Sequence, residues 1–103
     1  MQPGQKFRDA LKNNKPLIIP GAINAYSAKL AEKSGHSAIY LSGSGVAAAS
    51  YGLPDLGVTT MHDVLIDVKR ITSATSLPLL VDIDTGWGES DQIAETISEM
   101  GKA

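Results

Sequence analysis

The sequence predicts an α/β fold with a parallel sheet, because short apolar runs alternate with segments of helical spacing. The apolar runs are residues 17–19, 38–41 and 79–84, which we expect to be strands covered on both faces. Segments whose apolar residues recur every three or four positions precede, separate and follow these runs. Strands and helices that alternate in this way form βαβ units with right-handed crossovers.

Four helices are expected around these strands. Gly35 is the predicted C-cap of the second helix, Thr60 and Asp63 form a predicted capping box before the third, and Ser90 is the predicted cap of the fourth. Their predicted apolar faces are, in chain order, Phe7, Ala10 and Leu11; Ile23, Tyr26, Leu30 and Ala31; Met61, Val64, Leu65, Val68 and Ile71; and Ile93, Ala94, Ile97 and Met100.

The length of 103 residues limits the chain to one compact unit. A complete (β/α)₈ barrel of the TIM type takes about 250 residues. We therefore expect residues 1–103 to be the N-terminal portion of such a barrel: a short helix and the first three βα units, ending after the third strand and its helix. An independent flavodoxin-like domain also fits the length, but no nucleotide-binding fingerprint supports it.

Composition excludes several classes of function. Hydrophobic residues make up 43% and charged residues 19%, which argues against disorder. The net charge of −2 gives no electrostatic reason to expect nucleic acid or an anionic membrane as a partner. No apolar stretch has the length of a signal sequence or membrane span, so a cytoplasmic location is expected. The absence of cysteine excludes disulfides and a cysteine nucleophile in these residues.

Two aspartates at the end of the third predicted strand are candidate metal ligands. Residues i and i+2 of a strand point to the same face, which places the Cα atoms of Asp82 and Asp84 roughly 6.6 Å apart. Two such carboxylates need a cation or protons, and Mg²⁺ binds one or two carboxylates together with water. In the alternative interpretation, Asp84 caps a loop and Asp82 makes a structural hydrogen bond.

Further polar residues follow the second predicted strand. The run Ser42–Gly45 either cradles an anionic group with backbone N–H groups and hydroxyls or forms a tight turn of small residues. Asp55 follows Pro54, where a role in a turn is usual. Trp87 either lines a substrate pocket or packs beneath a loop. Ligands bind beyond the carboxyl ends of parallel strands, so we expect these segments to lie together.

Two segments carry a resemblance to a known family. The stretches IYLSGSGVAAASYGLPDLGVTTMHDVLIDVKRIT and SLPLLVDIDTGWG resemble methylisocitrate lyases, which belong to the isocitrate lyase and phosphoenolpyruvate mutase superfamily. The match runs from about Phe7 to Gly88. It implies a (β/α)₈ barrel that forms a tetramer and binds Mg²⁺. It also implies cleavage of 2-methylisocitrate to pyruvate and succinate in the methylcitrate cycle of propionate breakdown.

The resemblance also implies roles for individual residues. By position, Asp82 and Asp84 correspond to the acids that bind Mg²⁺, directly or through water. Asp55 corresponds to an acid near the metal-bound water and the substrate, and is the candidate catalytic residue. The stretch that binds the substrate carboxylate, with a tyrosine close by, corresponds to Tyr40, Ser42, Gly43 and Ser44.

The sequence departs from the family at two points. Ser44 stands where many relatives have Gly or Ala, and the chain diverges after Gly88. It contains no KKCGH-type loop with the family's catalytic cysteine, so we expect the 103 residues alone to be inactive. Two alternatives stay open: a superfamily member acting on oxaloacetate, isocitrate or phosphonopyruvate, and a non-catalytic remnant or interaction module. An exposed edge on the third strand predicts self-association.

Overall fold

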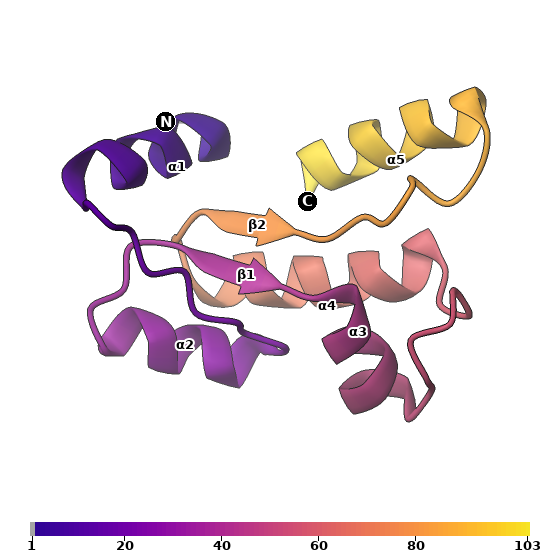
Figure 1. Ribbon diagram of the computed structural model, residues 1–103, viewed down its shortest axis with the longest axis horizontal. Coiled ribbons are helices and arrows are strands. Elements are labelled where there is room, and N and C mark those ends of the chain that lie inside the picture. Colours follow the sequence, from indigo (N-terminus) through magenta and orange to yellow (C-terminus); the bar gives the residue numbers. More distant parts are fainter. Residues whose placement is uncertain (1) are drawn as a thin grey trace.

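The computed structural model describes residues 2–103 and contains a small parallel sheet (Figure 1). Strands β1 (Ile39–Leu41) and β2 (Leu79–Val81) pair in parallel, with Tyr40 opposite Leu80. On the other side of β1, Tyr40 donates a backbone hydrogen bond to Pro20 and accepts one from Ala22, at 3.0 and 2.8 Å. The α/β class predicted from the sequence is therefore confirmed.

Two of the predicted strands are corrected by the structure. Residues 17–19 form no strand, and the chain reaches β1 only at a single bridge between Gly21 and Tyr40. Ile18 is 66% exposed, so this apolar run is not covered on both faces. The third predicted strand ends at Val81 rather than at residue 84. A strand requires a neighbour to pair with, and apolar composition alone does not supply one.

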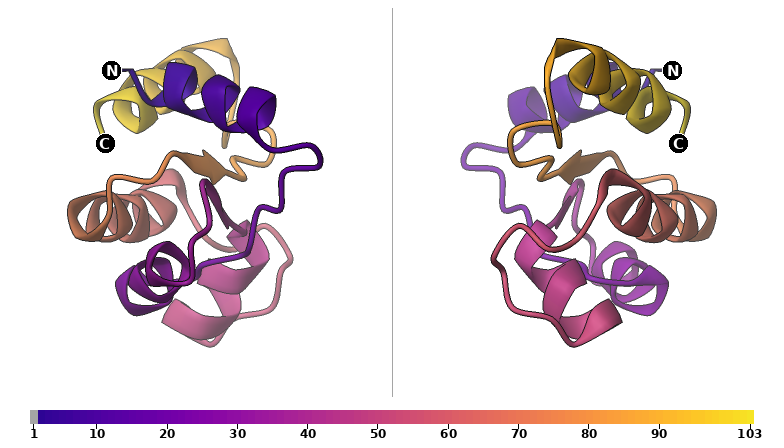
Figure 2. Two further views of the ribbon diagram at one scale, coloured as in Figure 1. Left: turned by 90° about the vertical axis from the view of Figure 1, so that its left-hand side faces the viewer. Right: turned by 90° about the vertical axis from the view of Figure 1, so that its right-hand side faces the viewer.

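Four long helices surround the sheet, as predicted. They are α1 (Pro3–Asn13), α2 (Ala25–Lys33), α4 (Met61–Ala74) and α5 (Ser90–Lys102). Gly35 follows α2 with a φ of 91°, as expected after a helix end. α4 contacts both α2 and α5, and the three helices follow one another around the sheet (Figure 2).

The predicted capping box of α4 is confirmed. The Thr60 hydroxyl accepts a hydrogen bond from the Asp63 backbone N–H at 3.3 Å, and the Thr60 N–H donates to Asp63 Oδ2 at 2.8 Å. The predicted cap of α5 lies one residue earlier than expected, because Glu89 occupies the N-cap and Ser90 begins the helix.

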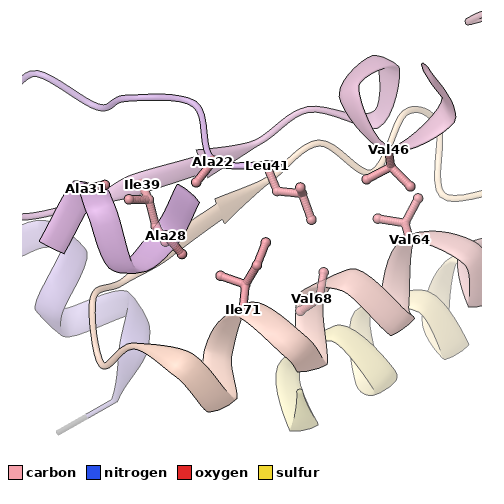
Figure 3. Packing of buried hydrophobic residues seen from close by; sticks show 9 residues of the cluster. All are labelled: Ala22, Ala28, Ala31, Ile39, Leu41, Val46, Val64, Val68 and Ile71. Carbon is pink, nitrogen blue, oxygen red and sulfur yellow. The ribbon is translucent and has the colours of Figure 1, made fainter. Parts of the chain in front are cut away.

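The core lies between β1, α2 and α4 (Figure 3). All five residues of the predicted apolar face of α4 are buried. The faces predicted for α2 and α5 are only partly right: α2 buries Ala31 but leaves Tyr26 73% exposed, and α5 leaves Ile97 58% exposed. Buried members of the core cluster are Ala22, Ala28, Ala31, Ile39, Leu41, Val46, Val64, Val68 and Ile71.

The small-residue run after β1 is helical rather than a tight turn. Ser42 is the N-cap of a short helix, α3 (Gly43–Gly45), and its hydroxyl accepts a hydrogen bond from the Gly45 N–H at 3.3 Å. A π-helical segment, η1 (Val46–Ser50), continues directly from α3. Within residues 2–103, no helix combines the length and apolar character that crossing a membrane requires.

Candidate metal and substrate site

Apart from Tyr40 in β1, the predicted site residues come from segments that follow the strands at one end of the sheet. Because β1 and β2 are parallel, their carboxyl ends point the same way (Figure 1). The end of β1 leads through Ser42 into α3, and the end of β2 leads into the loop 82–89. This common end is where open α/β sheets and barrels bind their ligands.

Asp82 lies at the contact between these two segments. Its backbone N–H donates to Leu41 at 3.0 Å, which extends the pairing of the strands by one residue. Its Oδ1 atom accepts a hydrogen bond from the Asp84 N–H at 3.0 Å, so the structural hydrogen bond of the alternative interpretation is present. Its Oδ2 atom faces Gly43, where an added Cβ would lie 3.5 Å away.

Asp84 is not placed as the sequence predicted. It lies beyond β2 in a left-handed conformation with a φ of 49°, so Asp82 and Asp84 do not share one face of a strand. The pKa of the Asp84 carboxyl is raised by partial loss of hydration and then by the negative charges of Asp82 and Asp55. Asp82 and Asp55 therefore lie close enough to Asp84 to act on it electrostatically.

The remaining predicted residues differ in their exposure. Tyr40 is half-buried in the centre of β1, and Gly43 is buried against Asp82. Ser42 is half-buried with its hydroxyl engaged in capping α3, whereas Ser44 is exposed. Asp55 lies in the exposed loop 51–58.

Two contacts that the sequence did not reveal anchor the loop after β2. The fully buried Thr96 of α5 donates from its hydroxyl to the Gly86 carbonyl at 2.9 Å. The indole Nε1 of Trp87 donates to the Thr59 carbonyl at 3.1 Å. Thr96 stands four residues before the partly buried Met100, and this helical spacing was a usable signal for its burial.

The acids suit a cation that keeps part of its water shell. Within residues 2–103, no three side chains of the metal-binding types are grouped closely enough to enclose an ion by themselves. Mg²⁺ does not need such a cage, since it commonly binds through one or two carboxylates with water and substrate oxygens. The same residues contain two ion pairs, Arg70 with Asp67 and Lys102 with Glu99. Neither pair includes an acid of this group. Its oxygen ligands and surplus negative charge therefore fit Mg²⁺.

A cavity lies elsewhere in the molecule. It has a volume of about 510 Å³ and lies between α1, the start of β2 and the end of α5, with Lys6, Leu79 and Met100 in its lining. Asp55, Asp82 and Asp84 do not line it. Asp55 and Asp84 are exposed and Asp82 is half-buried, so the acidic group is open to solvent.

Comparison with known proteins defines the class of protein. The family model described as phosphoenolpyruvate phosphomutase matches residues 7–103, and the chain belongs to this family. The match therefore extends beyond Gly88, and the expectation that the chain leaves the family there is wrong. A crystal structure of 2,3-dimethylmalate lyase, a member of the phosphoenolpyruvate mutase and isocitrate lyase superfamily, superposes with a TM-score of 0.84 at 32% identity. The superposition covers 97% of this chain and 36% of the 2,3-dimethylmalate lyase chain.

Within the family, the chain is strongly similar to 2-methylisocitrate lyases. It is 67% identical over 99 residues to the 2-methylisocitrate lyase of Shewanella oneidensis, a match covering 96% of this chain and 34% of the relative. A crystal structure of phosphonopyruvate hydrolase in complex with oxalate and Mg²⁺ superposes with a TM-score of 0.80 at 34% identity, over 99% of this chain and 36% of that one. The chain thus spans about a third of the length of the curated relatives it matches.

Proposed function

We propose that these residues form the N-terminal third of a Mg²⁺-dependent carbon–carbon lyase that cleaves 2-methylisocitrate to pyruvate and succinate. The observation that carries this proposal is the 67% identity to a 2-methylisocitrate lyase over 96% of the chain. Identity to the solved structures of superfamily members with other named substrates is lower, for example 34% to phosphonopyruvate hydrolase. This difference favours 2-methylisocitrate over oxaloacetate, isocitrate or phosphonopyruvate.

The proposal assigns the acids at the strand ends to the metal. Asp82 and Asp84 would hold Mg²⁺, directly or through water, and Asp55 would accept hydrogen bonds from metal-bound water or substrate. The bound ion would stabilise negative charge that develops on the substrate's oxygens. The relative solved with oxalate and Mg²⁺ supports the same pairing of a dicarboxylate with this metal.

The residues after β1 would bind the substrate carboxylate. Backbone N–H groups at the start of α3, around Gly43 and Ser44, are free of helical partners and suit a carboxylate oxygen. The Ser44 hydroxyl is exposed and available as a further donor, and Tyr40 lies in the adjoining strand. Gly43 has no side chain, so no Cβ covers Asp82 Oδ2 from this side.

The proposed reaction is a retro-aldol cleavage. The substrate hydroxyl loses a proton, the adjoining C–C bond breaks, and a carbonyl forms in the pyruvate product. The bonding electron pair passes to the carbon that becomes part of succinate, and an acid protonates that carbon. The chain has no cysteine, so the family's cysteine proton donor is not among these 103 residues.

The proposal also extends to architecture. Residues 1–103 would form the first part of a (β/α)₈ barrel, with α2, α4 and α5 in its outer ring of helices. The family resemblance further suggests a cytoplasmic homotetramer acting on small carboxylic acids, in propionate breakdown through the methylcitrate cycle.

A chimeric enzyme would test the proposed function. Residues 1–103 are fused to the remaining two thirds of the Shewanella oneidensis relative, and pyruvate release is measured with 2-methylisocitrate and Mg²⁺. We expect turnover by the chimera and none by the 103 residues alone. The Asp82→Asn substitution in the chimera should lower kcat/KM on the order of 100-fold by removing a metal ligand.

The control places the same substitution away from the site. Asp9→Asn in α1 changes a carboxylate that accepts a hydrogen bond from Gln5 and should leave turnover unchanged. A folded chimera that cleaves 2,3-dimethylmalate or isocitrate in preference to 2-methylisocitrate would contradict the proposed substrate. A folded chimera without any lyase activity would support the non-catalytic alternative.

A further inference from the structure

The indole of Trp87 joins the two loops that carry the candidate metal ligands. Its hydrogen bond to the Thr59 carbonyl links the loop after β2, with Asp82 and Asp84, to the loop before α4, with Asp55. Within residues 2–103, no other hydrogen bond connects these two loops. We propose that Trp87 is a positioning residue that holds Asp55 beside Asp82 and Asp84 for Mg²⁺ binding, an inference that rests on the proposed function.

The Thr59 end of this link is firmly fixed. Thr59 is buried and directly precedes Thr60, the N-cap of α4. The reciprocal hydrogen bonds of Thr60 and Asp63 hold this end of the helix, and α4 packs into the core by its apolar face. The carbonyl that receives the indole N–H is therefore attached to α4, which has more buried residues than any other described helix.

The Trp87 end keeps a backbone conformation that a bulky residue rarely adopts. Trp87 has a φ of 65°, in the left-handed region where glycine avoids a steric cost. Its ring is partly buried and packs against the core cluster. The free energy gained by burying the indole and forming its hydrogen bond must offset the free-energy cost of this backbone conformation. The side chain therefore holds the loop in place.

The same loop is also fixed against α5. A Cβ atom on Gly86 would lie 2.7 Å from Ile93 Cγ1, so the backbone here runs tightly against the helix. The Thr96 hydroxyl holds the Gly86 carbonyl one residue before Trp87. The loop is thus attached to α5 through Gly86 and to the start of α4 through Trp87, two consecutive residues.

The acids need such a link because their charges oppose one another. All three are aspartates, and carboxylates gathered around one ion carry like charge. The loop 51–58 that carries Asp55 is exposed along its length, so little buried contact resists its displacement. A link at Thr59, four residues after Asp55, reduces the free energy that an ion must supply to gather the three carboxylates.

An isosteric replacement tests the hydrogen bond with little change of shape. The chain contains one tryptophan, so growth of a tryptophan-requiring host on benzothienylalanine replaces the N–H by sulfur at position 87 alone. We expect the Kd for Mg²⁺, measured by calorimetry on the full 103-residue chain, to rise on the order of tenfold. W87F is a second variant that also lacks the donor. In the unmodified chain, the single indole N–H signal in ¹H–¹⁵N spectra should exchange slowly with water.

A stability-matched control separates positioning from general weakening. Ile71→Val trims a fully buried side chain of α4 away from both loops and should lower stability without changing the Kd for Mg²⁺. Equal Kd values for the unmodified chain and the benzothienylalanine form would overturn the inference while leaving the metal site intact. If the unmodified chain binds no Mg²⁺, the proposed metal site fails and the inference fails with it.

Discussion

Gly43 and Gly45 lie two residues apart in the same short helix, but their surroundings predict different effects of a methyl group. At Gly43 the nearest atom to an added Cβ is Asp82 Oδ2 at 3.5 Å, an ordinary contact. At Gly45 the nearest atom is Ile23 Cγ2 at 2.6 Å, which requires a side chain to shift. A substitution at Gly43 therefore tests the candidate metal site, and one at Gly45 tests the packing against Ile23.

We expect Gly43→Ala to spare folding and weaken the site. Its stability should stay within about 0.5 kcal/mol, because no close contact forms. Its Kd for Mg²⁺ should rise on the order of tenfold, because a methyl group would cover the carboxylate oxygen from the side of α3. Gly45→Ala should instead cost about 1 kcal/mol, since Ile23 must move. Urea unfolding and calorimetry measure the two effects, and unchanged Mg²⁺ binding by the Gly43 variant would remove Asp82 Oδ2 from the proposed site.

The π-helical segment η1 is held to α4 by a hydrogen bond at its last residue. The Ser50 hydroxyl donates to Asp67 Oδ2 at 2.6 Å, and the Asp67 side chain is only 4% exposed. Arg70 approaches the same carboxylate at 3.6 Å, but its side chain is 68% exposed, so that ion pair is strongly screened. The Ser50 hydrogen bond is therefore expected to dominate this attachment.

A double-mutant cycle measures this attachment. We expect Ser50→Ala and Asp67→Ala each to lower the free energy of unfolding by about 1–2 kcal/mol, because a hydrogen bond to a buried charge is lost. The double variant should lose less than the sum, with a coupling of about 1 kcal/mol. Arg70→Ala should cost under about 0.5 kcal/mol. Strictly additive losses in urea unfolding would show that Ser50 and Asp67 act independently.

Local signals predicted the helices better than the strands. The capping box at Thr60 and the apolar face of α4 depend on residues three or four apart, so the sequence around them contains the whole interaction. The strand predicted at residues 17–19 depends on a partner elsewhere in the chain, and no strand within residues 2–103 pairs with it. At the site, the sequence predicted which segments meet, but the turn at Asp84 and the link from Trp87 to Thr59 depend on tertiary contacts.

The whole molecule is compact but exposes more surface than its mass predicts. Its radius of gyration of 13.6 Å is close to the roughly 13 Å of a compact 100-residue domain. Its accessible surface of 6277 Å² exceeds the roughly 5,500 Å² expected for a monomer of 10.8 kDa. The excess approaches the roughly 800 Å² that one partner buries in a standard interface.

Large apolar side chains contribute to this surface. Leu80 of β2 is 44% exposed, and within residues 2–103 β2 pairs only with β1, so one edge of this strand has no partner. Exposed apolar residues also occur on α2, on α5 and in the loops before α2 and α4; they include Ile18, Ile23, Leu30, Leu56, Val58, Ile93 and Ile97. An unpaired strand edge beside apolar side chains favours association with another chain.

We therefore expect the 103-residue chain to self-associate in a concentration-dependent way, measured by light scattering after gel filtration and by sedimentation. Leu80→Lys should weaken this association, because a charge on an edge strand opposes pairing with another strand and removes exposed apolar area. Ser98→Lys adds the same charge at an exposed position of α5 and should have less effect. A monodisperse monomer at every concentration would contradict the prediction. Equal weakening by both lysines would assign the association to net charge rather than to the edge of β2, because only Leu80 lies on that strand.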